Sequence, residues 1–188
     1  HNDRLGSLIF AGKDHVELKP RRGKSAVLDL IGRTCKHPAW KNPHDTQARD
    51  MSHAMSRLRK VTRPGSLVFL ISDFRDMDQQ AESHLINIAR HNDVVLIQVF
   101  DPVEAELPPA GSYKVSDGNS DLQLNTADKK LRQEYRQRFD QRQARLAKLC
   151  RQHRMYLLPV STQNDVLSSL QQGLGIPASK HAQFKARA

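Results

Sequence analysis

Apolar residues in this chain follow two alternating patterns. Four short apolar runs have the length of strands and lie at residues 7–11, 66–72, 94–100 and 155–160. Most of the stretches between them place apolar residues three or four positions apart, as on one face of a helix. Strands that alternate with amphipathic helices predict an α/β domain in three layers, with an open, mostly parallel sheet and helices on both faces.

Turn residues and prolines set the boundaries of the predicted elements. Ser25 is expected to cap the first helix, Asp45 or Thr46 the second, and Thr162 or Asn164 the last. A single domain is expected over residues 1–175, with a frayed basic tail at 176–188. The predicted elements are, in chain order, a hairpin of strands 7–11 and 15–19, a helix 25–31, a loop 33–45, a helix 46–61, a strand 66–72 buried on both faces, a helix 76–91, a buried strand 94–100, a loop 104–111, short strands 112–116 and 121–125, a helix 127–154, a strand 155–160 and a final helix to residue 174.

Positive charge is concentrated in one predicted helix. The chain has 30 Lys and Arg against 20 Asp and Glu, and a formal net charge of +10. Residues 127–154 carry ten of these basic residues and three acidic ones. A basic helix can track phosphates, so a nucleic-acid-binding domain is one alternative. Because Tyr135 and Phe139 lie on the apolar side of the helix, a solvated face that meets acidic protein or lipid is favoured over nucleic acid.

Cysteine usage and hydropathy bear on the compartment. The two cysteines, Cys35 and Cys150, cannot form a disulfide framework and fit a reducing compartment. The longest apolar runs have the length of strands rather than of membrane spans. Residue 1 is His and no targeting leader is visible, so we expect a fragment of a longer protein. The expected location is therefore a reducing compartment such as the cytoplasm.

Carboxylates follow the two most apolar strands. Asp73 comes directly after residues 66–72, and Asp101 follows residues 94–100. Ligands of open α/β sheets bind at the carboxyl ends of strands, so these positions are candidate sites. Asp73 could hold a divalent cation or could instead be a turn or capping residue. Asp101 and Glu104 lie in an acidic, proline-containing loop that could be solvated or serve as a contact surface, and Ser72 is a further binding candidate.

Motifs of catalysis are not found. The run from Arg21 to Ser25 lacks the first glycine of a phosphate-binding loop, although an anion could bind there. The spacing of Cys35, His37 and His44 does not match paired zinc ligands. No Gly-x-Ser-x-Gly elbow and no spacing for a Ser/His/Asp triad is present. The sequence therefore predicts a protein that is not an enzyme and has no small-molecule substrate. A hydrolase built around Asp73 is a less favoured alternative.

Three segments resemble one family. They are DRLGSLIF at residues 3–10, GSLVFLISDF at 65–74, and HNDV at 91–94 with DPVE at 101–104 and Leu107-Pro108. Together they resemble the von Willebrand factor A-like domain of a bacterial group known as "domain of unknown function 58". Members of that group are encoded beside MoxR-type AAA+ ATPases. The resemblance covers roughly residues 3–172.

This resemblance implies a protein-interaction module that acts with a MoxR-type AAA+ ATPase in assembling or activating other proteins. It also implies a site for Mg²⁺ and a partner's carboxylate, with Asp73 as the matching metal ligand. The family's metal-binding threonine falls near Thr46, although Arg49 stands at the matching register. The family's first metal-site strand, Asp-x-Ser-x-Ser, would precede residue 1. The resemblance also implies a cytoplasmic domain whose parent could be anchored to the inner membrane by upstream segments. We therefore expect no cofactor in this chain and Mg²⁺ only in a longer parent. We also expect a sheet that lacks a central strand. Such a sheet would either close up or borrow a strand, by strand exchange or in a homodimer.

Overall fold

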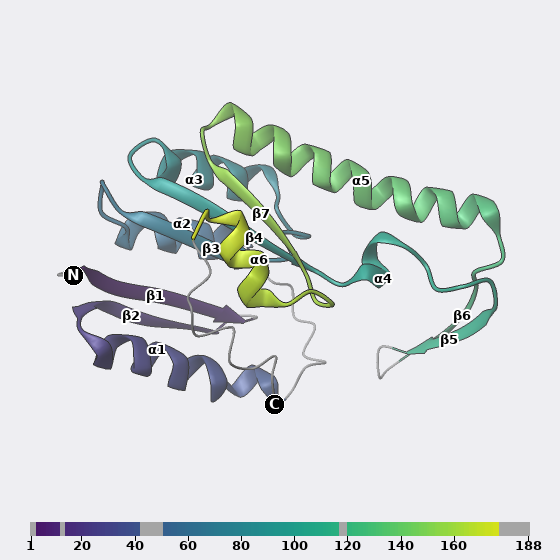
Figure 1. Ribbon diagram of the computed structural model, residues 1–188, viewed down its shortest axis with the longest axis horizontal. Helices are drawn as coiled ribbons and strands as arrows, with labels where there is room; N and C mark the ends of the chain where they lie inside the picture. Colours follow the sequence, from purple (N-terminus) through teal and green to yellow (C-terminus); the bar gives the residue numbers. More distant parts are fainter. Residues whose placement is uncertain (1–2, 12–13, 42–50, 117–119, 177–188) are drawn as a thin grey trace. The chain divides into compact units, whose positions relative to one another are not determined.

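The computed structural model describes residues 3–11, 14–41, 51–116 and 120–176 (Figure 1). Contacts divide the chain into two compact units, which are described separately. The first unit comprises His1–Thr62, Asp76–Leu85 and Asp117–Ser120. The second unit comprises Arg63–Arg75, Ile86–Ser116 and Asp121–Ala188. That residues 1–175 form a single domain stays a prediction.

The first unit contains the predicted hairpin. Strands β1 (Arg4–Ala11) and β2 (Asp14–Arg22) pair antiparallel. The strand β2 continues beyond Pro20, where the sequence pattern had placed its end. A shift of register between Leu5 and Ser7 accommodates the proline, because a bulge needs no ladder hydrogen bond from it. Opposite the proline lies Gly6, where a Cβ atom would come within 3.0 Å of the Cγ of Pro20.

Helices of the first unit differ from the prediction at their ends. Helix α1 (Lys24–Cys35) is N-capped by Gly23 at φ 87° without a side-chain hydrogen bond, so Ser25 is not its cap. It passes through Gly32, since a glycine inside a helix costs only about 1 kcal/mol. A short 3₁₀ helix, η1 (Pro38–Trp40), and helix α2 (Met51–Val61) follow. The predicted caps Asp45 and Thr46 lie outside the described residues.

The second unit contains a parallel sheet in the order β3-β4-β7, formed by β3 (Leu67–Ser72), β4 (Asp93–Phe100) and β7 (Tyr156–Ser161). Helix α6 (Val166–Gly173) places Leu170 against Val95, Ile97 and Val160 on one face. On the other face, the ring of Phe139 in helix α5 (Lys129–Gln152) lies 5.4 Å from that of Phe100. The predicted α/β fold, with a parallel sheet flanked by helices, is confirmed.

Strand β3 is not buried on both faces, so that prediction is wrong. Its residues alternate: Val68 and Leu70 are buried, whereas Leu67, Phe69 and Ile71 are 61%, 46% and 66% exposed. The exposed residues share a face with Val95 and Ile97 of β4, and on that face Leu170 of α6 packs against β4 and β7. Strand β4 lies between two neighbours and has four consecutive buried apolar residues, Val94 to Ile97.

Helix α3 (Gln79–Ala89) follows β3 in the chain and crosses the division between the units, with Ala81, Leu85 and Ile88 buried as predicted. The strands β5 (Ser112–Ser116) and β6 (Asp121–Asn125) form the predicted antiparallel pair. The loop predicted at 104–111 instead begins within a helical turn, α4 (Pro102–Ala105). Among the described helices, none combines the length and hydropathy that a membrane span requires.

Candidate functional site

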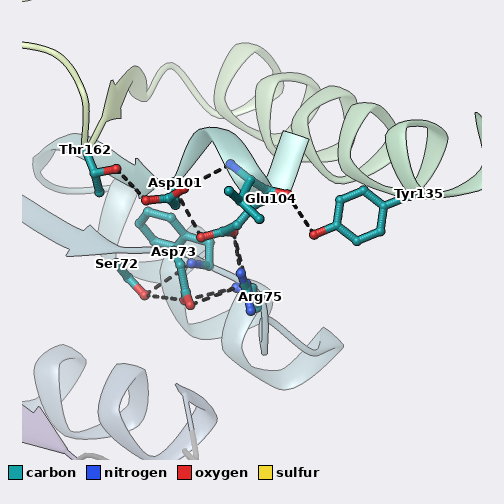
Figure 2. A network of polar contacts seen from close by, with 9 residues as sticks. Ser72, Asp73, Arg75, Asp101, Glu104, Tyr135 and Thr162 are labelled. Atoms are coloured by element: carbon teal, nitrogen blue, oxygen red, sulfur yellow. Dashed lines mark hydrogen bonds and ion pairs between the residues drawn. The ribbon is translucent and has the colours of Figure 1, made fainter. Parts of the chain in front are cut away.

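The carboxyl ends of β3 and β4 lie side by side. Ser72 at the end of β3 is in register with Gln98 of β4, so the segments that follow both strands leave the sheet at the same edge. This edge gathers four of the predicted site residues, Ser72, Asp73, Asp101 and Glu104. Figure 2 shows them in one polar network with Arg75, Thr162 and Tyr135. We call this group the carboxyl-edge network.

Asp101 and Glu104 build a capping box around the first turn of α4. The Oδ1 of Asp101 accepts a hydrogen bond from the backbone N–H of Val103 at 2.9 Å. In return, Oε1 of Glu104 accepts one from the N–H of Asp101 at 3.2 Å. Pro102 occupies the first helical turn, where its missing N–H costs nothing. These local bonds fix the direction of the Glu104 side chain, whose Oε2 remains available to a third group.

Asp101 also joins β4 to the segment after β7. The hydroxyl of Thr162 donates to Oδ2 of Asp101 at 2.8 Å, and its N–H donates to the carbonyl of Phe100 at 3.0 Å. The hydrogen bonds from Val103 and then Thr162 lower the pKa of Asp101 below its ordinary value. Thr162 is therefore not the cap of α6, and neither is Asn164. The cap is Asp165, which accepts from Ser168 N–H at 2.7 Å.

The turn after β3 has an unusual backbone. Phe74 has φ 53°, in the left-handed region, although its side chain is buried. A bulky residue in this region costs about 1–3 kcal/mol and persists only where the surroundings enforce it. Here the N–H of Phe74 donates to Oγ of Ser72 at 3.2 Å, and the N–H of Arg75 donates to Oδ1 of Asp73 at 3.3 Å. Burial of the ring and these bonds hold the strained turn.

Arg75 is the cation of the network. Its Nη2 lies 2.5 Å and its Nε lies 3.1 Å from Oε2 of Glu104, and its Nε lies 3.7 Å from Oδ2 of Asp73. The hydrogen bond to Glu104 is the main reason that the pKa of Arg75 is raised. Sequence reasoning missed this residue. A usable signal was its place two positions after a strand-terminal aspartate, in a segment that also carries two later carboxylates.

The described residues do not fit the Mg²⁺ that the resemblance implies. A magnesium ion needs several oxygen ligands in octahedral geometry. At this edge Asp73 has Ser72 Oγ 3.4 Å from its Oδ1 and the guanidinium of Arg75 beside its Oδ2. The described ranges contain no cluster of three or more His, Cys, Asp or Glu side chains placed to hold a metal ion. Thr46 lies outside these ranges.

Two further residues of the second unit have contacts that the sequence did not predict. Tyr135 of α5 donates its hydroxyl to the carbonyl of Val103 at 2.9 Å, and so fixes α4 against the long helix. Gln98 is only 5% exposed, and its Oε1 has no hydrogen-bond partner among the described residues. A lone glutamine inside an apolar strand was the signal for this position.

Helix α5 presents the basic surface that the sequence indicated. Two of its described ion pairs lie within the helix, Lys130 with Glu134 and Arg136 with Asp140, and a third joins Arg132 to Glu106 after α4. Phe139 and Leu146 are buried and Tyr135 is half-buried, so the aromatic rings point into the unit as predicted. The guanidinium of Arg142 lies 5.9 Å from the centre of the Phe139 ring.

Comparisons with known proteins show which proteins share this fold and sequence. The chain is 26% identical over 169 residues to the uncharacterized proteins Mb1516 of Mycobacterium bovis and Rv1480 of Mycobacterium tuberculosis. The match covers 89% of this chain and 52% of each relative, so the chain spans about half the length of the curated relatives it matches.

Two solved structures share the fold at low sequence identity. BatB from Bacteroides thetaiotaomicron is similar with a TM-score of 0.53 at 16% identity, over 93% of this chain and 79% of that one. An aerotolerance-related membrane protein from Bacteroides fragilis gives 0.52 at 13% identity, over 93% and 80%. Among family models, the one described as "Protein of unknown function DUF58" matches residues 1–145. This chain therefore belongs to the DUF58 family.

Proposed function

We propose that this chain is a non-enzymatic protein-interaction module that acts with a MoxR-type AAA+ ATPase in the assembly or activation of other proteins. The carboxyl-edge network is the proposed contact surface. The charges of the network indicate the kind of partner. Its three carboxylates and one guanidinium favour a partner surface that offers both basic and acidic side chains. The von Willebrand A-like character of the domain is part of this proposal.

The strained, charged turn after β3 is the observation that carries the proposal. Phe74 is held in a left-handed conformation beside Asp73 and Arg75, at the edge where α/β sheets bind their ligands. Asp73, Arg75 and Glu104 remain partly exposed, so a partner can reach them. The named residues of the network include no His, Cys or Lys, and its hydroxyls donate to Asp73, to Asp101 or to the backbone, which favours binding over catalysis.

The test is direct binding between this chain and a purified MoxR-type ATPase from the same organism, measured by calorimetry. We expect Asp73→Asn with Arg75→Ala to weaken binding by about tenfold or more, because central charged contacts of interfaces cost over 1 kcal/mol when removed. Glu134→Gln on α5 is the matched control and should leave binding unchanged. Equal binding by the double variant and the wild type would reject the proposed surface.

We also propose a cytoplasmic location, near a membrane-associated assembly. Cys35 and Cys150 are both free, as is usual for proteins of reducing compartments. One structural neighbour is an aerotolerance-related membrane protein, and a role for this chain beside membrane proteins is consistent with that likeness. Mg²⁺ binding, where it occurs, is proposed for a longer parent rather than for this edge.

A nucleic-acid-binding function is the second candidate, and the basic exposed face of α5 favours it. Binding of this kind would depend steeply on salt and little on sequence. A DNA titration at several salt concentrations tests it, with Arg138, Arg142 and Arg145 each changed to Gln. Binding that is weak and unaffected by these changes removes the candidate, whereas a reduced salt slope supports it.

A further inference from the structure

We infer that Arg75 is the built-in cation of the carboxyl-edge network and takes the place of a divalent ion at Asp73. The inference concerns the same edge as the proposed function but does not depend on partner binding. The family resemblance implies Mg²⁺ at Asp73, whereas the residues that surround Asp73 do not fit a magnesium ion.

Position is the first argument. A cation at this edge has to join the segment after β3 to the segment after β4, and Arg75 does so. Its guanidinium contacts Glu104 at 2.5 and 3.1 Å and lies 3.7 Å from Asp73. Figure 2 shows the guanidinium beside both carboxylates. A planar guanidinium permanently carries its charge, so this bridge needs no exogenous ion.

Electrostatics is the second argument. A divalent ion at Asp73 would meet a positive charge close to its ligand, and like charges at such distances repel. To bridge Asp73 and Glu104, the ion would have to displace Arg75 from Glu104, which breaks a charge-assisted hydrogen bond. The other oxygen of Asp73 already accepts the N–H of Arg75 at 3.3 Å. The side chain of Arg75 therefore occupies the cation position, and the backbone N–H of Arg75 donates a hydrogen bond to the same carboxylate.

Removal of the guanidinium should uncover the carboxylates. In Arg75→Gln, Asp73 and Glu104 lose their shared counter-charge but keep their positions, because the turn hydrogen bonds and the capping box do not involve the guanidinium. Two uncompensated carboxylates attract a divalent ion. Loss of one nearby positive charge should raise the affinity for Mn²⁺ by about tenfold or more.

The experiment measures Mn²⁺ and Mg²⁺ binding to the purified chain by calorimetry and by the shift of the thermal midpoint, at constant ionic strength. We expect no saturable binding by the wild type or by Arg75→Lys, and a new, saturable Mn²⁺ response in Arg75→Gln. The response should disappear in Arg75→Gln with Glu104→Gln. Arg90→Gln, which removes an exposed arginine of the same unit, is the control for net charge.

Each outcome decides the inference. Saturable Mn²⁺ binding by the wild type that is lost in Asp73→Asn would overturn it, because the guanidinium would then not occupy the cation position. A folded Arg75→Gln variant without a gain over Arg90→Gln would also overturn it. If Arg75→Gln does not fold, the wild type and Arg75→Lys still decide, since Arg75→Lys keeps the charge and must remain unresponsive. No partner protein is present, so failure here leaves the proposed interaction surface standing.

Discussion

The strands β3 and β4 look alike in the sequence and differ in the structure. Both are continuous apolar runs that end in an aspartate. Strand β4 lies between β3 and β7 and buries both faces, whereas β3 is an edge strand with three exposed apolar side chains. The run of apolar residues thus specifies a strand, but the elements that pack on each face determine which of its side chains are buried.

The two aspartates that end these strands differ as well. Asp101 accepts hydrogen bonds from Val103 and Thr162, so its carboxylate is committed to the local fold. Asp73 accepts two longer bonds, from the N–H of Arg75 at 3.3 Å and from the hydroxyl of Ser72 at 3.4 Å, and lies beside the Arg75 guanidinium. Identical residues at equivalent strand ends therefore have different surroundings: Asp101 stabilises the edge, whereas Asp73 lies beside Arg75 and stays partly exposed at the proposed contact surface.

The largest expected effect comes from truncation within the strands. Leu96→Ala in β4 should lower the free energy of unfolding by about 2–5 kcal/mol, because it leaves a cavity in a fully buried position. Ile71→Ala in β3 removes a mostly exposed side chain and should cost less than about 1 kcal/mol. Urea denaturation of both variants measures the contrast. Equal losses would mean that β3 is covered in solution.

A smaller effect is expected at the strand ends. Asp101→Ala removes the cap of α4 and the bond to Thr162, and should lower the thermal midpoint by about 2–4 °C. Asp73→Ala should lower it by less, since its described bonds are longer. Asp101→Asn, which keeps an acceptor, is the control and should recover most of the loss. If Asp73→Ala lowers the thermal midpoint more than Asp101→Ala does, Asp73 rather than Asp101 is the aspartate that stabilises the edge.

The smallest effect concerns acid stability. The pKa of Asp101 is lower in the folded chain than its ordinary value of 3.8, so its contribution to stability is present above pH 3.8 and is lost as the pH falls through the folded value. Asp101→Asn should therefore show a shallower loss of stability below pH 3.8 than the wild type. Identical profiles of unfolding free energy between pH 2 and pH 5 would contradict this.

Much of the fold could be predicted because local patterns determine it. The bounds of β5 and β6 agree with the prediction, and helix α5 differs from it by two residues at each end. The predictions that failed concern the residues that cap the helices and the burial of strand β3. The cap of α6 is Asp165 rather than Thr162, because Thr162 bonds to Asp101, which is 61 residues away in the chain. No local pattern contains such a long-range partner.

The candidate site could be predicted only in part. Asp73 and Asp101 could be predicted because ligands of open α/β sheets bind at the carboxyl ends of strands. Glu104 could be predicted from the Asp-Pro-x-Glu spacing that follows the second of these strands. Arg75 was missed because its role depends on the position of Glu104, 29 residues later. The left-handed turn at Phe74 was also hidden, since the sequence places a bulky residue where such a backbone favours glycine.

The most direct test of the central claim is a crystal structure of the wild-type chain grown with Mn²⁺, with anomalous data collected for the metal. The account predicts the guanidinium of Arg75 within hydrogen-bond distance of Glu104 and no anomalous peak at Asp73. A manganese peak bound to Asp73, with the Arg75 side chain turned away from Glu104, would contradict it.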